Sequence, residues 1–91
     1  PVDEAKLGLP LHAFTELRFA GDTPVAEIAG VAHGMREVEA VFTLAGDPDA
    51  VAWLRVRDVR HLTQTIDQLR RSGKVIGTKT LMVLDTWTNK P

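Results

Sequence analysis

Two carboxylates on a short loop are the residues of this chain best suited to chemistry. They lie in the stretch Gly46-Asp47-Pro48-Asp49, with an apolar run on each side. Glycine and a Pro-Asp pair favour a sharp turn, so the pattern predicts a β-hairpin with both aspartates and a permissive glycine at its tip. Such a tip suits the rim of a binding site for a small ligand, although turn propensity alone also explains each residue of the loop.

The histidines do not form a recognisable metal or catalytic site. His12, His33 and His61 fall in a predicted strand, at a helix end and at a helix start, without ligand spacing. The chain has no cysteine and no tyrosine, which excludes thiolate chemistry and a cysteine-type zinc site. We expect no metal, no cofactor and no catalytic residue, and we expect His61 to lie on the surface.

Composition indicates an ordinary globular domain. The 91 residues leave room for one domain, with 44% hydrophobic and 25% charged residues. A formal net charge of −1 lacks the basic footprint that DNA or RNA binding needs. No apolar run approaches the roughly 18 residues of a membrane span, and we expect a cytoplasmic protein. Because the first residue is Pro1, we expect either a fragment of a longer protein or a processed, stand-alone domain.

The first half of the chain predicts a linker, a strand and a helix. Residues 1–10 mix charges with glycine and proline, and they predict a linker that leads into a domain over residues 11–91. Residues 11–19 alternate between apolar and polar, as a strand does. Pro24 suits the first position of a helix. The apolar residues that follow at helical spacing are Val25, Ile28, Ala29, Ala32 and Met35.

The second half predicts two strands, a helix and a last strand. Apolar residues on both parities predict strands over about 38–45 and 51–57, each buried on two sides. Asp58 is expected to cap a helix that ends at a left-handed glycine, Gly73. A long strand over about 75–87 follows. The inward stripe of the helix is expected to be Val59, Leu62, Ile66 and Leu69.

This order of elements predicts a ferredoxin-like βαββαβ sandwich, an α+β fold with both helices on one face of an antiparallel sheet. The other face would have no cover within the chain. Several of its expected residues are too apolar to face water, so we expect it to pack on the sheet of a second copy, as a dimeric α+β barrel. The expected interface residues are Val41, Val51, Trp53, Leu81 and Val83.

Several spaced segments together resemble the C-terminal effector and oligomerisation (RAM) domain of the leucine-responsive/asparagine-responsive (Lrp/AsnC, feast/famine) transcription regulators. The resemblance spans nearly the whole chain. Each segment alone is a weak signal, and the four in this order are a more specific one. They are LGLPLHAF at residues 7–14, residues 38–46 with Asp49, LRVRD at residues 54–58, and TKTLMVL at residues 78–84.

The resemblance implies a domain that dimerises through its sheet, assembles further into octamers in some members, and binds a small effector, commonly an amino acid, where dimers meet. It places that effector beside Gly46, Asp47 and Asp49 of the loop and beside Thr78 and Thr80 of the last strand. An aspartate can accept hydrogen bonds from an ammonium group, while threonine hydroxyls and backbone N–H groups can donate to a carboxylate. Many relatives have an aromatic residue where this chain has proline in the loop.

Such regulators carry an N-terminal helix-turn-helix domain, which the 91 residues do not contain. The resemblance therefore implies a non-enzymatic sensor that reaches DNA only through that missing domain. Two alternatives share the strand order: an amino-acid-binding allosteric module of a metabolic enzyme, and a small dimeric α+β barrel enzyme. The barrel enzyme would need a histidine or tyrosine acid/base pair in the sandwich, and the scattered histidines do not suggest one.

Overall fold

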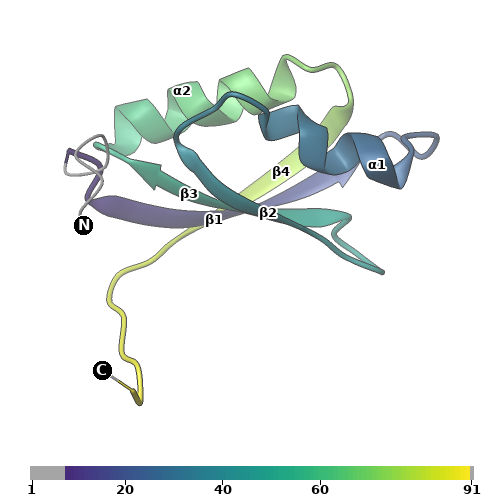
Figure 1. Ribbon diagram of the computed structural model, residues 1–91. Coiled ribbons are helices and arrows are strands. Elements are labelled where there is room, and N and C mark those ends of the chain that lie inside the picture. The colour runs from purple at the N-terminus through teal and green to yellow at the C-terminus, as the bar shows by residue number, and fades with distance from the viewer. Residues whose placement is uncertain (1–7, 91) are drawn as a thin grey trace.

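The computed structural model describes residues 8–90, so most of the linker predicted over residues 1–10 lies outside the described residues. A four-stranded antiparallel sheet carries its helices on one face (Figure 1). The strands are β1 (Leu11–Phe19), β2 (Val38–Thr43), β3 (Ala50–Val56) and β4 (Val75–Met82), in the order β2-β3-β1-β4. The helical elements are α1 (Val25–Ile28), the 3-10 helix η2 (Ala29–Ala32) and α2 (Val59–Arg70). This arrangement confirms the predicted ferredoxin-like α+β fold.

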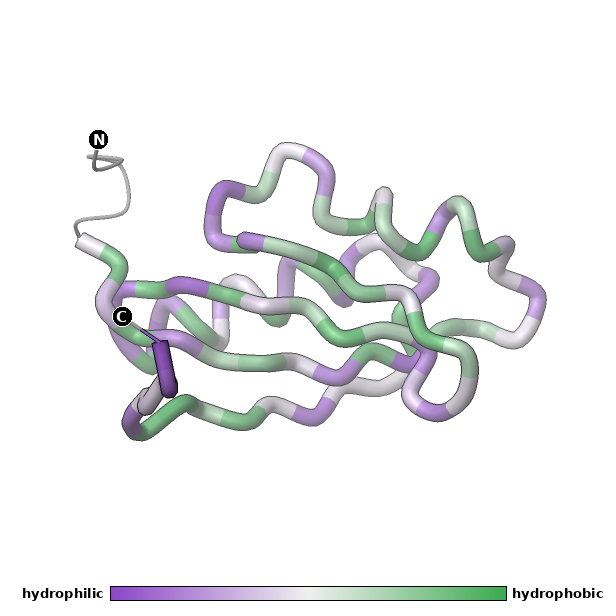
Figure 2. Tube along the Cα trace, turned by 60° about the horizontal axis from the view of Figure 1, so that its bottom comes forward, coloured by the Kyte–Doolittle hydropathy of each residue, from purple (hydrophilic) through white to green (hydrophobic). Residues whose placement is uncertain are grey.

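Strict alternation along β1 and β3 gives the sheet a covered face and an uncovered face. Side chains on the covered face lie under the helices, whereas those between them, such as Phe14 and Trp53, point away from the helices. Figure 2 turns the lower side of Figure 1 toward the viewer and shows hydrophobic and hydrophilic residues alternating along the strands. The paired residues of the covered face are Ala13 with Leu54, Thr15 with Ala52, and Leu17 with Ala50.

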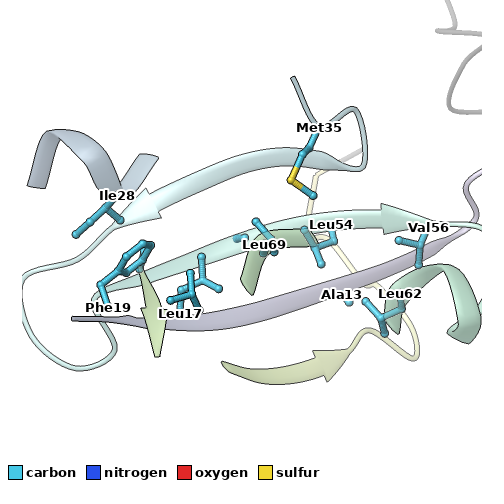
Figure 3. Close-up of a cluster of buried hydrophobic side chains, with 12 residues drawn as sticks. Ala13, Leu17, Phe19, Ile28, Met35, Leu54, Val56, Leu62 and Leu69 are labelled. Atoms are coloured by element: carbon cyan, nitrogen blue, oxygen red, sulfur yellow. The ribbon is translucent and has the colours of Figure 1, made fainter. Parts of the chain in front are cut away.

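The hydrophobic core lies between the covered face and the helical layer (Figure 3). Leu17, Leu54 and Leu69 are fully buried and come from β1, β3 and α2. Ile28 and Met35, on either side of η2, belong to the same cluster. Full burial of one such side chain stabilises the fold by about 1.5–3 kcal/mol, so these leucines hold β1, β3 and α2 together.

The first helical segment is shorter than predicted. Pro24 is the N-cap residue, with extended backbone angles, and α1 has four residues before the chain tightens into η2. Val25, predicted to face the core, is 70% exposed. Gly34 adopts φ 80°, which reverses the backbone and ends the segment. Only Ile28 and Met35 of the predicted stripe are buried.

A bulge in β2 changes the face to which its residues belong. Val38 pairs with Leu54, yet Ala40 pairs with Trp53, so the register shifts between residues 38 and 40. A bulge inserts one extra residue into a strand and so reverses the alternation of the residues beyond it. Residues before and after the bulge therefore do not follow one simple alternation between the two faces.

The bulge corrects the predicted position of Val41. This residue pairs with Ala52 and packs against the core, so its predicted place on the uncovered face is wrong. Phe42 pairs with Val51 and occupies the uncovered face instead, with 50% of its surface exposed.

Helix α2 begins and ends as predicted, but its buried side differs. Asp58 caps it by accepting a hydrogen bond from the backbone N–H of His61 at 2.8 Å, and Gly73 takes φ 78° after the last turn. Val59, predicted to face inward, is 60% exposed. His61, predicted to lie on the surface, is buried, because polar partners beneath the helix satisfy its ring.

Strand β4 ends at Met82, well before the predicted end at residue 87. Its partner β1 begins at Leu11, and the last ladder bond joins the N–H of Val83 to the carbonyl of His12 at 2.9 Å. Beyond this point only Leu11 of β1 remains, so the chain has almost no strand left to pair with. Residues 83–90, here called the C-terminal arm, leave the sheet on the side away from the helices (Figure 1).

Candidate functional site

The loop between β2 and β3 is tied closely to the end of β1. The N–H of Asp49 donates to the carbonyl of Leu17 at 3.1 Å, and its Oδ2 accepts from the backbone N–H of Phe19 at 2.8 Å. Gly46 has φ 135°, a region that residues with a Cβ rarely adopt. A carboxylate has further acceptor positions, so Asp49 can hold a ligand donor while it keeps this structural bond.

Asp47 lies at the exposed tip of the loop and pairs with Arg18, whose Nε is 2.9 Å from its Oδ1. A second carboxylate, that of Glu16, lies 3.7 Å from the same guanidinium. Arg18 stands between the buried residues Leu17 and Phe19, so it belongs to the uncovered face. This end of the sheet therefore presents the carboxylates of Asp47 and Glu16 and the guanidinium of Arg18. Carboxylates can bind the ammonium group of a zwitterion, and a guanidinium can bind its carboxylate.

Thr78 and Thr80 lie on the covered face of β4. Thr80 pairs with the fully buried Thr15, and their hydroxyl oxygens are 3.0 Å apart. Thr78 pairs with Leu17, and its hydroxyl accepts a hydrogen bond from Arg70 of α2 at 3.4 Å. Both hydroxyls therefore have partners on the helical side of the sheet.

The residues predicted to contact an effector thus form two groups on different faces. Gly46, Asp47 and Asp49 surround the end of β1, with Asp47 on the uncovered side, while Thr78 and Thr80 point toward the helices. Within residues 8–90, no hydrogen bond joins the loop to either threonine. In a single chain, Asp47 and the two threonines therefore lie on opposite faces of the sheet.

An aromatic cluster occupies the centre of the uncovered face. Trp53 stacks on Phe14 and on His12, with ring centroids 6.5 Å and 6.0 Å apart. The indole Nε1–H donates to Nδ1 of His12 at 3.2 Å. Apolar residues continue the surface on the neighbouring strands, so the four remaining residues of the predicted interface share this face: Val51, Trp53, Leu81 and Val83.

Buried His61 and partly buried Glu37 form a polar pair that the sequence pattern did not indicate. The Nδ1 of His61 accepts from the backbone N–H of Arg57 at 3.0 Å, which assigns the ring proton to Nε2, 3.0 Å from Oε2 of Glu37. Burial raises the pKa of Glu37, but the hydrogen bond from His61 and the charge of Arg36 help to lower it below its ordinary value of 4.5. Both ring nitrogens are occupied, so the pair fastens α2 to the start of β2.

The described part of the chain has neither a cluster of metal-ligating side chains nor a helix suited to a membrane. No group of three or more histidine, aspartate or glutamate side chains is arranged to hold a metal ion. None of the helices between residues 8 and 90 has the length and apolar character needed to cross a membrane.

Residues 12–91 match the family model of the Lrp/AsnC ligand binding domain. A curated relative is the HTH-type transcriptional regulator LysM of Saccharolobus solfataricus, 27% identical over 84 residues. The match covers 92% of this chain and 59% of LysM. The chain therefore spans about three fifths of the length of that relative.

Solved structures with the same fold include two regulators with bound methionine. The feast or famine regulatory protein of M. tuberculosis complexed with L-methionine superposes with a TM-score of 0.81 at 22% identity, over 100% of this chain and 62% of that one. The transcriptional regulator NMB0573/L-Met complex of Neisseria meningitidis gives 0.82 at 20% identity, over 98% of this chain and 59% of that one. A third structure, TTHA0845 of Thermus thermophilus, gives 0.74 at 26% identity, over 87% of this chain and 99% of that one.

Proposed function

The chain belongs to the family of Lrp/AsnC ligand binding domains, and from this membership we propose that it binds an amino-acid effector and self-associates as part of a transcription regulator. The observation that carries the proposal is the family match, which extends from His12 to the last residue. The regulator LysM and the two methionine-bound structures support the same reading. The domain would act by binding alone, without catalysis.

We propose that the ammonium group of the effector binds at the loop of Gly46, Asp47 and Asp49. Thr78 and Thr80 would then contribute from another chain, because within one chain they lie on the opposite face of the sheet. This division supports a site that is completed only where chains meet. We also propose that residues 1–10 are a linker and that residues 11–91 are the sensing and oligomerisation domain.

The uncovered face supports self-association as a homodimer, with an octamer as the higher assembly. Phe14, Trp53 and Leu81 form a continuous apolar surface, and Phe42 extends it toward the edge. A stable interface removes about 800 Å² from each partner, a scale that one face of a four-stranded sheet can supply. A second copy would cover this face as the helices cover the other.

Signalling would follow from linkage between effector binding and assembly. An effector that binds one arrangement of chains more tightly shifts the population toward that arrangement, and the reverse holds equally. We propose that this shift changes the spacing of DNA-binding domains that lie outside these 91 residues, in a cytoplasmic regulator. A non-catalytic role is supported by His61, both of whose ring nitrogens bond within the fold, and by His12, whose Nδ1 accepts from Trp53.

Calorimetric titration with a panel of amino acids at millimolar concentration, paired with light scattering, tests the proposal. We expect one amino acid to bind and to change the mass or dispersity of the assembly. Asp49→Asn should weaken this binding, because the amide loses the charge that an ammonium group requires. A chain that binds none of the amino acids, with its assembly unchanged, would show that the sensing role is wrong.

A further inference from the structure

The C-terminal arm carries two large apolar side chains that the rest of the described chain does not cover. Leu84 is 97% exposed and Trp87 is 81% exposed, the highest values among the exposed large hydrophobic residues. A tryptophan buries roughly 150–250 Å² when it is packed, so leaving one in water forfeits a large apolar contact. Single exposed apolar residues are common on protein surfaces, whereas a leucine and a tryptophan together on a projecting segment suggest a contact surface.

Polar contacts of the arm do not bring it back to the body of the domain. After the bond from the N–H of Val83 to β1, the hydrogen bonds of the described arm are local: Thr86 N–H to its neighbour Asp85, and Thr88 Oγ1 to the carbonyl of Lys90. These contacts shape the arm itself. They leave both apolar side chains facing outward.

The direction of the arm identifies its partner. It leaves the sheet on the side of the uncovered face, opposite the helices (Figure 1), and it starts from Val83, which belongs to that face. Eight residues in extended form reach roughly 26 Å, comparable to the shorter extents of the molecule, 29 Å and 23 Å. A second copy seated on the uncovered face would therefore lie within reach of Leu84 and Trp87.

We propose that the C-terminal arm binds a second copy of this chain, with Trp87 and Leu84 packed on the surface of that copy. This inference rests on the sheet-to-sheet dimer proposed above. By two-fold symmetry each copy would hold the other with its own arm, so a dimer contains two such contacts. A central, fully desolvated tryptophan is a frequent source of binding energy in protein interfaces.

Sedimentation over a range of concentrations, on the whole 91-residue chain, tests the proposal. The variants are Trp87→Ala and the double variant Leu84→Ala/Trp87→Ala. Val59→Ala is the matched control, since it also shortens an exposed apolar side chain but lies on α2, away from the uncovered face. We expect Trp87→Ala to raise the dimer dissociation constant at least about tenfold, the double variant to raise it further, and the control to leave it unchanged.

Acrylamide quenching supplies a second readout. The difference between the emission of the wild type and that of Trp87→Ala isolates Trp87, since the chain has only one other tryptophan, Trp53. We expect Trp87 to become protected as the chain associates. The arm contact would be wrong, and the dimer correct, if the wild type dimerises, Trp87→Ala has the same dissociation constant, and Trp87 of the wild type stays accessible to acrylamide. A wild type that is monomeric at high micromolar concentration would overturn both.

Discussion

Asp49 joins a structural role to the proposed binding role, and two substitutions separate them. Its Oδ2 accepts from the N–H of Phe19, a buried residue at the end of β1. Asp49→Ala should lower the free energy of unfolding by about 1–2 kcal/mol, because it leaves this donor unpaired. Asp49→Asn keeps an acceptor and should retain most of the stability. Urea denaturation of both variants measures the difference.

Asp47 is the comparison residue for this experiment. Its ion pair with Arg18 is exposed, and such pairs contribute little to stability. Asp47→Asn should therefore unfold at nearly the same urea concentration as the wild type. Equal destabilisation by Asp49→Ala and Asp47→Asn would contradict the structural role assigned to Asp49.

The pair of Glu37 and His61 predicts a specific dependence of stability on pH. The pKa of Glu37 is lower in the fold than its ordinary value of 4.5, so the folded state favours its charged form. This stabilisation is present above the ordinary pKa and is lost as the pH falls through the lowered value. Glu37→Gln should cost about 1–2 kcal/mol near pH 7, since it weakens a charge-assisted hydrogen bond. The difference from the wild type should shrink below pH 4.5.

Glu27→Gln is the matched control for this measurement. Glu27 is half exposed and lies 3.7 Å from Lys74, so its ion pair is weak. Denaturant unfolding at several pH values should show a difference that varies with pH for Glu37→Gln and almost none for Glu27→Gln. A constant difference for Glu37→Gln from neutral pH down to strongly acidic pH would rule out the proposed linkage.

Single residues could be predicted where a local pattern determines them. The cap at Asp58 and the stop at Gly73 were correct because each depends on its own helix end. The burial of His61 was missed because it depends on Glu37, which is distant in sequence and is brought near by the sheet. Roles of the loop and threonine residues in effector binding remain predictions.

The end of α2 provides a prediction at the scale of one element. Gly73 has φ 78°, and a Cβ there would meet no atom within 4 Å, so only the backbone conformation opposes a larger residue. Gly73→Ala should lower stability by about 1 kcal/mol. Gly21→Ala is the control, because its site is equally open and its φ is not positive. Thermal melts should show a lower midpoint for the first variant alone.

The bounds of a strand or helix were predicted well where one sequence pattern runs along the whole element. Strands β1 and β3 and helix α2 were close to their observed bounds, because alternation marks β1, a continuous apolar run marks β3 and helical spacing marks α2. The predicted last strand was too long, since apolar residues continue after β1 has run out of partners. Helix α1 was too long as well, because the glycine-rich segment after it cannot sustain a regular helix.

At the scale of the whole molecule, the uncovered face makes a testable prediction about assembly. Phe42 lies there half exposed, so Phe42→Glu should leave the fold of one chain intact while it places a charge in the proposed interface. We expect a shift from dimer to monomer in light scattering. Val59→Glu, on the helical side, should remain a dimer, and a dimeric Phe42→Glu would argue against sheet-to-sheet pairing.

The fold class was predictable from the order of strands and helices, whereas the exact composition of each face was not. A single inserted residue in β2 moved Val41 into the core and Phe42 to the outside. Periodicity cannot reveal such a bulge, because the flanking residues are apolar on both parities. The proposed effector site would depend on contacts between chains, which one sequence pattern does not determine.

The bulge in β2 also bears on how copies avoid polymerising. β2 is an edge strand of the sheet, and a straight edge with free N–H and C=O groups invites another strand to pair with it without limit. The irregularity between residues 38 and 40 interrupts that template near the start of the strand. Growth into open-ended ribbons is thereby disfavoured at this edge, so the proposed association through the uncovered face would not compete with strand pairing there.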